Sequence, residues 1–232
     1  QICSKLEKTA LKGDDHLNIT RINFSNLVIS NSRIVAELGA KANTELVFQN
    51  MLVRDNNLAL YSKYSNDCSI KVLNSSFKHN TNSHSGLYLR CANITVHINS
   101  SLFKFTPLLI KNIANMPTRW RKTMILVQKT IFNGERIRQC ASMLAIYPYA
   151  AVLNVTIFDS EFRNQLANCR SGHNYQSVST VLVEERQYDV RDTTYIFLRN
   201  LIFENNYNNW ASLSVTAGYM QKTEINVKVE KS

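Results

Sequence analysis

One spacing of apolar and turn-forming residues recurs seven times along the chain. An apolar residue is followed two positions later by a turn-former, which is Lys in one copy, and a second apolar residue comes three positions after that. The last apolar residues of successive copies are 24, 24, 26, 29, 30 and 41 positions apart. The copies are Phe24/Asn26/Ile29, Phe48/Asn50/Val53, Val72/Asn74/Phe77, Ile98/Ser100/Phe103, Val127/Lys129/Phe132, Ile157/Asp159/Phe162 and Leu198/Asn200/Phe203. Such a regular spacing, lengthened only by insertions, is typical of a stacked solenoid.

Short strands are predicted on either side of each turn. Residues 94–98, 153–157 and 225–229 are apolar at every second position and rich in β-branched side chains, as expected for half-buried strands. A third apolar run follows in the coils, at residues 58–61, 86–90, 108–111, 143–147, 180–184 and 212–216. No segment keeps a helical period. A β-sandwich also has short strands and frequent turns, but it does not require the same residue types at the same offsets seven times.

The pattern therefore predicts an all-β fold, a parallel β-helix of about seven to eight coils with three short strands each. Over about residues 16–230, these coils resemble the right-handed parallel β-helix of the pectin-lyase-like superfamily. The resemblance includes the Asn turn, which in that family lies between the second and third strands of a coil. Asn tolerates the left-handed conformation that a sharp bend needs, and stacked Asn side chains are expected to form an internal ladder. We expect residues 1–15 to be a lead-in or cap and 16–232 a single domain that continues beyond Ser232.

The five cysteines fit this coil map in two pairs. Cys68 and Cys91 are placed in equivalent turns of neighbouring coils, and Cys140 and Cys169 in equivalent loops. Stacked turns lie about 5 Å apart, which suits disulfides, so we expect Cys68–Cys91 and Cys140–Cys169 bridges. Two such bridges favour an oxidising compartment over the alternative of free thiols in the cytosol. Cys3 is left over.

Six Asn-X-Ser/Thr sequons begin at residues 18, 23, 74, 93, 99 and 154, a small excess over chance. Asn74 is placed on the internal ladder, so Asn93, Asn99 and Asn154, which alternate outward, are the expected glycan acceptors. Cysteines and sequons together predict a secreted or cell-surface protein. No apolar run of 18 residues is present, so no membrane-spanning helix is expected in this segment.

The pectin-lyase-like resemblance implies an active cleft on the outer face of the third strand, lined by carboxylates for Ca²⁺ or acid–base chemistry. By alternation that face carries Tyr88, Arg90 and Lys111 here, and the runs above supply one outward carboxylate, Glu184. Paired carboxylates and a six-oxygen calcium site are therefore not expected, and we predict a protein that is not an enzyme. No nucleotide, metal or cofactor motif is found; the spacing of His79 and His84 is a weak zinc signal.

The net charge of +10 points to an acidic partner, which outside the cell means an acidic protein or a sulfated glycan rather than a nucleic acid. Basic and aromatic residues concentrate in the loops at 112–122, 134–139 and 165–177, which are the predicted binding surface. The alternative is that these are ordinary solvated loops. The candidate ligand-binding residues are Lys111, Arg119, Trp120, Arg121, Lys122, Arg136, Arg138, Tyr88, Arg90 and Tyr175.

The sequence therefore favours a non-enzymatic extracellular recognition module, one part of a larger polypeptide. A polysaccharide lyase or glycoside hydrolase of the pectin-lyase-like kind is the first alternative. A structural adhesin shaft is the second.

Overall fold

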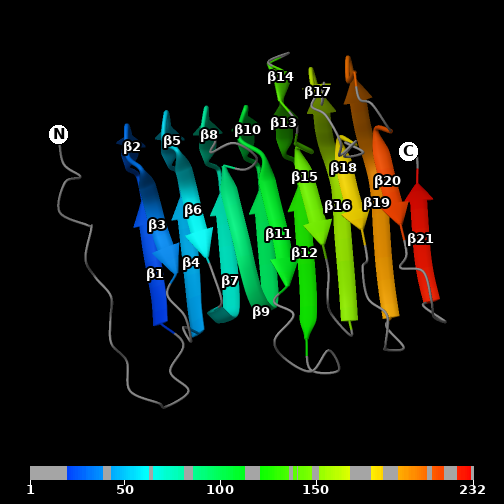
Figure 1. Cartoon of the computed structure of the whole chain (residues 1–232), viewed down its shortest axis with the longest axis horizontal. Helices are drawn as coiled ribbons and strands as arrows, with labels where there is room; N and C mark the ends of the chain where they lie inside the picture. The colour runs from blue at the N-terminus through cyan, green and yellow to red at the C-terminus, as the bar shows by residue number, and fades with distance from the viewer. Residues whose placement is uncertain are drawn as a thin grey trace, which may run out of the picture.

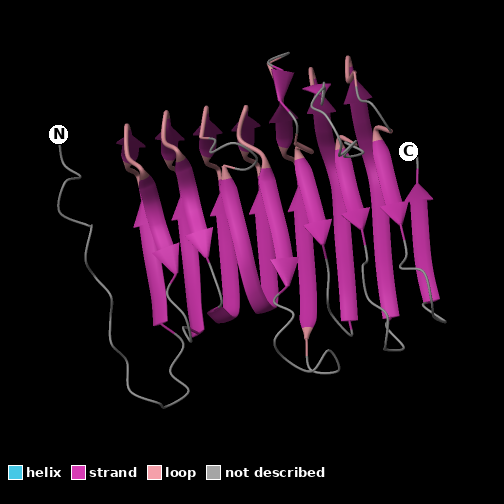
Figure 2. Cartoon of the chain, viewed as in Figure 1, coloured by secondary structure: helices cyan, strands magenta, loops and turns pink. Residues whose placement is uncertain are grey.

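The computed structural model describes residues 20–38, 43–62, 65–80, 86–112, 121–135, 138–139, 141–147, 152–167, 179–184, 193–207, 211–216 and 224–230. Every regular element within these ranges is a β-strand, as Figure 2 shows. The all-β prediction is confirmed for this part of the chain.

Strands of three kinds recur in order and form three rows along the molecule (Figure 1). The first row holds β1 (Thr20–Ser25), β4 (Asn43–Gln49), β7 (Ser65–Leu73), the end of β9 (Leu87–Asn99), β12 (Lys122–Gln128), the start of β16 (Val152–Arg163) and of β19 (Thr193–Glu204), and β21 (Glu224–Glu230). The second row holds β2 (Val28–Ser30), β5 (Leu52–Arg54), β8 (Ser76–Lys78), β10 (Leu102–Lys104), β13 (Ile131–Asn133) and the ends of β16 and β19. The third row holds β3 (Ile34–Leu38), β6 (Leu58–Ser62), the start of β9, β11 (Leu108–Asn112), β15 (Leu144–Tyr147), β18 (Val181–Glu184) and β20 (Leu213–Thr216).

Within each row, every strand pairs in parallel with its equivalent in the next coil. Phe24 of β1 pairs with Phe48 of β4, which pairs with Val72 of β7. The coils therefore follow one another from the blue to the red end of Figure 1. Residues at equal offsets in the sequence are neighbours in space, as the repeat predicts, and the fold is a parallel β-solenoid. A separate short pair, β14 (Arg138–Gln139) with β17 (Leu166–Ala167), lies outside the three rows.

The predicted turn column is present, with one correction to where its side chains lie. All seven turn-formers, Lys129 included, have left-handed φ angles between 47° and 56°. The amide of Asn50 donates to the side-chain oxygen of Asn26 at 3.1 Å, and Asn200 donates to Asp159 at 2.8 Å. However, Asn26, Asn50 and Asn74 are exposed, so this ladder is external and not internal. The turn residues lie at the tip of a bend, where a side chain points away from the core.

The internal polar ladder belongs to a second turn, which the sequence analysis did not find. Asn31, Asp55 and His79, five positions after the first three turn-formers, are also left-handed. The next residue in two of these coils, Asn56 and Asn80, is buried. Asn56 donates its side-chain amide to the Asn80 side-chain oxygen at 2.8 Å, and Asn80 donates to the carbonyl of Val53 at 2.8 Å. Buried amides are thus satisfied by the coil above and below.

Phenylalanines stack through the core along the solenoid axis. The rings of Phe77, Phe103, Phe132 and Phe162 lie 4.8–5.2 Å apart and nearly parallel. All four side chains are at most 1% exposed. Phe48 joins this stack edge-on through Phe77, at 5.8 Å, because it comes from the other apolar position of the repeat. The apolar residues of the repeat are therefore the core, as predicted.

The structure contains the Cys68–Cys91 disulfide, with the two Cα atoms 6.1 Å apart. Both cysteines are buried and lie within strands, not in turns as the coil map placed them. Cys68 pairs in register with Ile94 rather than with Cys91, because β9 runs without a break from the third row into the first. The bridge therefore links neighbouring coils diagonally. Cys3, Cys140 and Cys169 lie outside the described residues.

Candidate functional site

The outer face of the third row brings three of the predicted binding residues together. Tyr88 and Arg90 alternate with the buried Leu87 and Leu89 on β9, so both point away from the core. Arg90 pairs in register with Lys111 of β11. Side chains at paired positions of neighbouring parallel strands are about 5 Å apart, which places two cations side by side on a rigid sheet. All three side chains are half-buried.

The same face continues with few carboxylates. Lys111 pairs with Tyr147 of β15, and Glu184 ends β18 in the following coil. The backbone of Glu37 in β3 is in register with Tyr61 and Tyr88, and the sequence analysis missed this strand because residues 34–38 were not assigned to the third row. Glu37 and Glu184 are separated by five strand spacings, roughly 24 Å. Paired carboxylates of glycosidases stand about 5–10 Å apart.

Arg121, one of the predicted binding residues, is buried and does not lie on the surface. Its side chain is 2% exposed, and its carbonyl, directly before β12, accepts a hydrogen bond from the Val152 N–H. Burial lowers the pKa of the Arg121 guanidinium. Position 121 is two residues before the inward-facing Thr123 and so lies on the same, inward face of the strand. The sequence analysis missed this because it treated residues 119–122 together as one basic run.

The structure describes only some of the other predicted binding residues. Lys122 is exposed, and its backbone N–H donates to the side chain of Asn93 at 2.9 Å. The backbone of Arg138 lies in β14, but its side chain is not described. Arg119, Trp120, Arg136 and Tyr175 lie outside the described residues.

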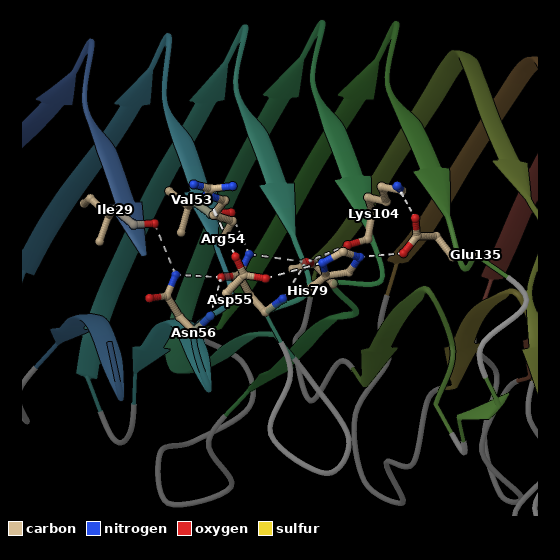
Figure 3. Close-up of polar contacts among 10 residues, drawn as sticks. Ile29, Val53, Arg54, Asp55, Asn56, His79, Lys104 and Glu135 are labelled. Carbon is tan, nitrogen blue, oxygen red and sulfur yellow. Dashed lines mark hydrogen bonds and ion pairs between the residues drawn. The ribbon is translucent and has the colours of Figure 1, made fainter. Parts of the chain in front are cut away.

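A chain of polar side-chain contacts crosses the second turns of successive coils (Figure 3). His79 Nδ1 lies 3.4 Å from Asp55 Oδ1, and His79 Nε2 lies 2.5 Å from Glu135 Oε2. Lys104 also pairs with Glu135. Both ring nitrogens of His79 face a carboxylate on opposite sides, so neither is directed at a space where a substrate could bind. These partly exposed pairs tie four coils together along the surface.

The sequence feature that accompanies this chain of contacts is a second left-handed residue in each of the first four coils, five positions after the first turn-former. It could not be recognised because Asn31, Asp55, His79 and Phe105 share no residue type. His84, the partner proposed for His79 in a zinc site, lies outside the described residues.

A small hollow lies beside these turns, between Phe105, Pro107, Gly134 and Met143. Its volume is about 10 Å³, close to the space of one water molecule and too small for a sugar ring. A Cβ on Gly134 would come within 2.8 Å of the Asn164 carbonyl oxygen, so glycine is required there.

Within the described ranges, no three His, Cys, Asp or Glu side chains are grouped so as to hold a metal ion. The same residues contain no helix of the length and apolarity needed to cross a membrane.

Comparison of the chain with protein-family models, with curated proteins and with solved structures found no match.

Proposed function

We propose that this chain is an extracellular recognition module that binds an acidic partner, either a sulfated glycan or an acidic protein, through the outer face of its third row. The observation that supports this best is the pairing of Arg90 with Lys111, beside Tyr88, on rigid parallel strands. Arg and Tyr are enriched where proteins bind partners. Two cations fixed one strand spacing apart suit a partner with closely spaced negative charges.

The finer fold assignment belongs to the same proposal. The solenoid is a right-handed parallel β-helix of about seven to eight coils, of the pectin-lyase-like kind. Its right-handed sense follows from the strong preference of parallel strand connections for that hand. In this proposal the protein is a non-catalytic member, because the described outward side chains of the third row supply one carboxylate, Glu184, and no pair.

Location outside the cell is supported by the Cys68–Cys91 bridge, since stable disulfides form in oxidising compartments. The net charge of +10 adds a general attraction to anionic surfaces and sulfated polymers.

The test compares two double variants that each remove two positive charges. Arg90→Ala/Lys111→Ala changes the proposed face, and Lys129→Ala/Arg199→Ala changes two exposed cations on the first turn and first row. On a heparin column, we expect the first variant to elute at lower salt than the second. Equal elution of the two variants would contradict the proposed face, and release of unsaturated sugars from an acidic polysaccharide would favour a lyase instead. Matching thermal midpoints confirm that both variants fold.

A further inference from the structure

The sequon asparagines of the described chain gather on one face. Asn23 lies in β1, Asn93 and Asn99 lie in the first-row part of β9, and Asn154 lies in β16. Asn74 directly follows the first-row strand β7. The described parts of the second and third rows contain no sequon. Asn18, the sixth, lies outside the described residues.

Four of these five asparagines keep the amide nitrogen available. Asn23, Asn99 and Asn154 accept a hydrogen bond at Oδ1, from Arg21, Ser100 and Thr156 respectively, and Nδ2 of each has no hydrogen bond to a described residue. Asn74 is exposed at the tip of its turn. At these positions no hydrogen bond to a described residue has to be broken before a glycan is attached to the nitrogen.

Asn93 differs because both ends of its side chain are used. Its Nδ2 donates to Asp67 Oδ1 at 2.7 Å, and its Oδ1 accepts from the Lys122 backbone N–H at 2.9 Å. These bonds join three successive first-row strands. A glycan on Nδ2 would take the place of one donated hydrogen and force the sugar into the contact with Asp67.

The surroundings of Asn154 point to a bound sugar. Asn154 pairs in register with Met124 on one side and Tyr195 on the other. These two large side chains are 49% and 48% exposed, although they lie in the middle of a sheet face. Leu126 and Phe197, one outward position along, are half-buried. Neighbouring exposed apolar side chains can mark a place where another group binds, and the apolar face of a sugar ring is a group that fits them.

We propose that the outer face of the first row carries N-linked glycans at Asn154, Asn23, Asn74 and Asn99, that the first sugars on Asn154 lie over Met124 and Tyr195, and that Asn93 stays unmodified. In the transfer, Asn Nδ2 forms a bond to the anomeric carbon of a lipid-linked oligosaccharide. The bond from that carbon to the lipid pyrophosphate breaks, the pyrophosphate leaves with the electron pair, and the amide proton passes to a base of the transferase.

This inference rests on the extracellular location in the proposed function and adds an orientation to it. Glycans are bulky and solubilising, so a glycosylated first row cannot also be a close contact face. The third row, with Arg90 and Lys111, is left bare for the acidic partner.

The experiment maps occupancy on the full chain secreted from eukaryotic cells. Enzymatic removal of the glycans in heavy-oxygen water converts each occupied Asn to a mass-labelled Asp, which peptide mass spectrometry locates. We expect label at Asn154 and at Asn23, Asn74 and Asn99, and none at Asn93. An unlabelled Asn154 or a labelled Asn93 in the folded secreted protein would overturn the proposal.

A second measurement tests whether the sugars cover Met124 and Tyr195. It uses protein that is already folded, so glycan removal does not interfere with folding. Glycan removal from the folded protein should increase the binding of a hydrophobic dye, and Met124→Thr/Tyr195→Thr should abolish most of that increase. No increase would refute the placement of the sugars.

Heparin retention of the same samples separates this inference from the proposed function. Occupied Asn154 without Arg90/Lys111-dependent retention would refute only the acidic-partner face. Retention with an empty Asn154 would refute only the glycan-bearing face.

Discussion

The left-handed backbone conformation at the turn tips is the feature that residue types in this sequence indicate most clearly. Four of the seven turn-formers are Asn, which tolerates φ near +50° better than most residues. Ser100, Asp159 and Lys129 adopt the same conformation in the remaining copies. Because the neighbouring coils hold the backbone in this shape, Lys129 also adopts the left-handed conformation. This conformation is unfavourable for Lys and lowers the free energy of unfolding.

Replacing that lysine should stabilise the protein. Lys129 has a φ of 49° and an exposed side chain, so Lys129→Asn relieves strain without disturbing a buried contact. We expect the free energy of unfolding to rise by about 1 kcal/mol, measured by urea denaturation. Lys129→Ala is the control, since Ala removes the charge but lacks the short polar side chain that lets Asn tolerate the left-handed conformation. An equal effect of the two substitutions would show that loss of the charge, and not the backbone, is responsible.

Burial of single residues was harder to predict than turn conformation. Asn56 and Asn80 look like ordinary loop amides in the sequence, and Arg121 looks like part of an exposed basic run. All three are at most 3% exposed. Their burial depends on which strand stacks above and below, and a single repeat of the sequence does not contain that information.

At the scale of elements, alternation separates the core from the surface along β9 and β11, but not along β15, where Leu144, Ala145 and Ile146 are all buried. The burial pattern of β9 shows inward Leu87, Leu89 and Cys91, a shift at Ala92, and then inward Ile94, Val96 and Ile98. The shift by one residue marks the corner between the third and first rows. The sequence analysis placed a turn there, because a strand that bends without a break has no turn residues to identify it.

The phenylalanine stack gives a direct test of the core assignment. Phe132 is 1% exposed and has ring neighbours at 5.0 and 4.8 Å, so Phe132→Ala should lower the free energy of unfolding by about 3–5 kcal/mol. Phe158→Ala is the matched control, because Phe158 lies on the outer face of the same sheet with Arg199 over its ring at 5.5 Å. We expect a clearly smaller loss there by denaturant unfolding. Comparable losses would contradict the inward placement of the Phe132 column.

At the scale of the whole molecule, each strand pairs only with its equivalents in the two neighbouring coils, so the number of paired neighbours affects how firmly a strand is held. The first-row strands β9, β12 and β16 have a parallel partner on both sides, whereas β1 and β21 each have one among the described strands. In a solenoid, each repeat is stabilised by its own residues and by its interfaces with the repeats beside it.

Hydrogen exchange should follow this order. Backbone amides of β9, β12 and β16 should exchange slowest, and those of β1 and β21 faster, because local opening needs less free energy where a strand pairs with one described strand and not two. Exchange measured by mass spectrometry on the intact chain tests this expectation. Uniform protection from end to end would indicate a single cooperative unit instead.

The sequence by itself determined the stacked parallel coils, the left-handed turn column and the apolar core, because these depend on residue types repeated at fixed offsets. It also indicated the Cys68–Cys91 bridge, since the cysteines recur in neighbouring coils. Only the tertiary structure decided that the Asn column is external, that Arg121 is buried, that His79 is held between two carboxylates, and that the sequons share one face. Those features depend on how the three rows of strands are oriented relative to one another and joined at the corners. Contacts between rows follow from side-chain packing, which the period of the sequence does not specify.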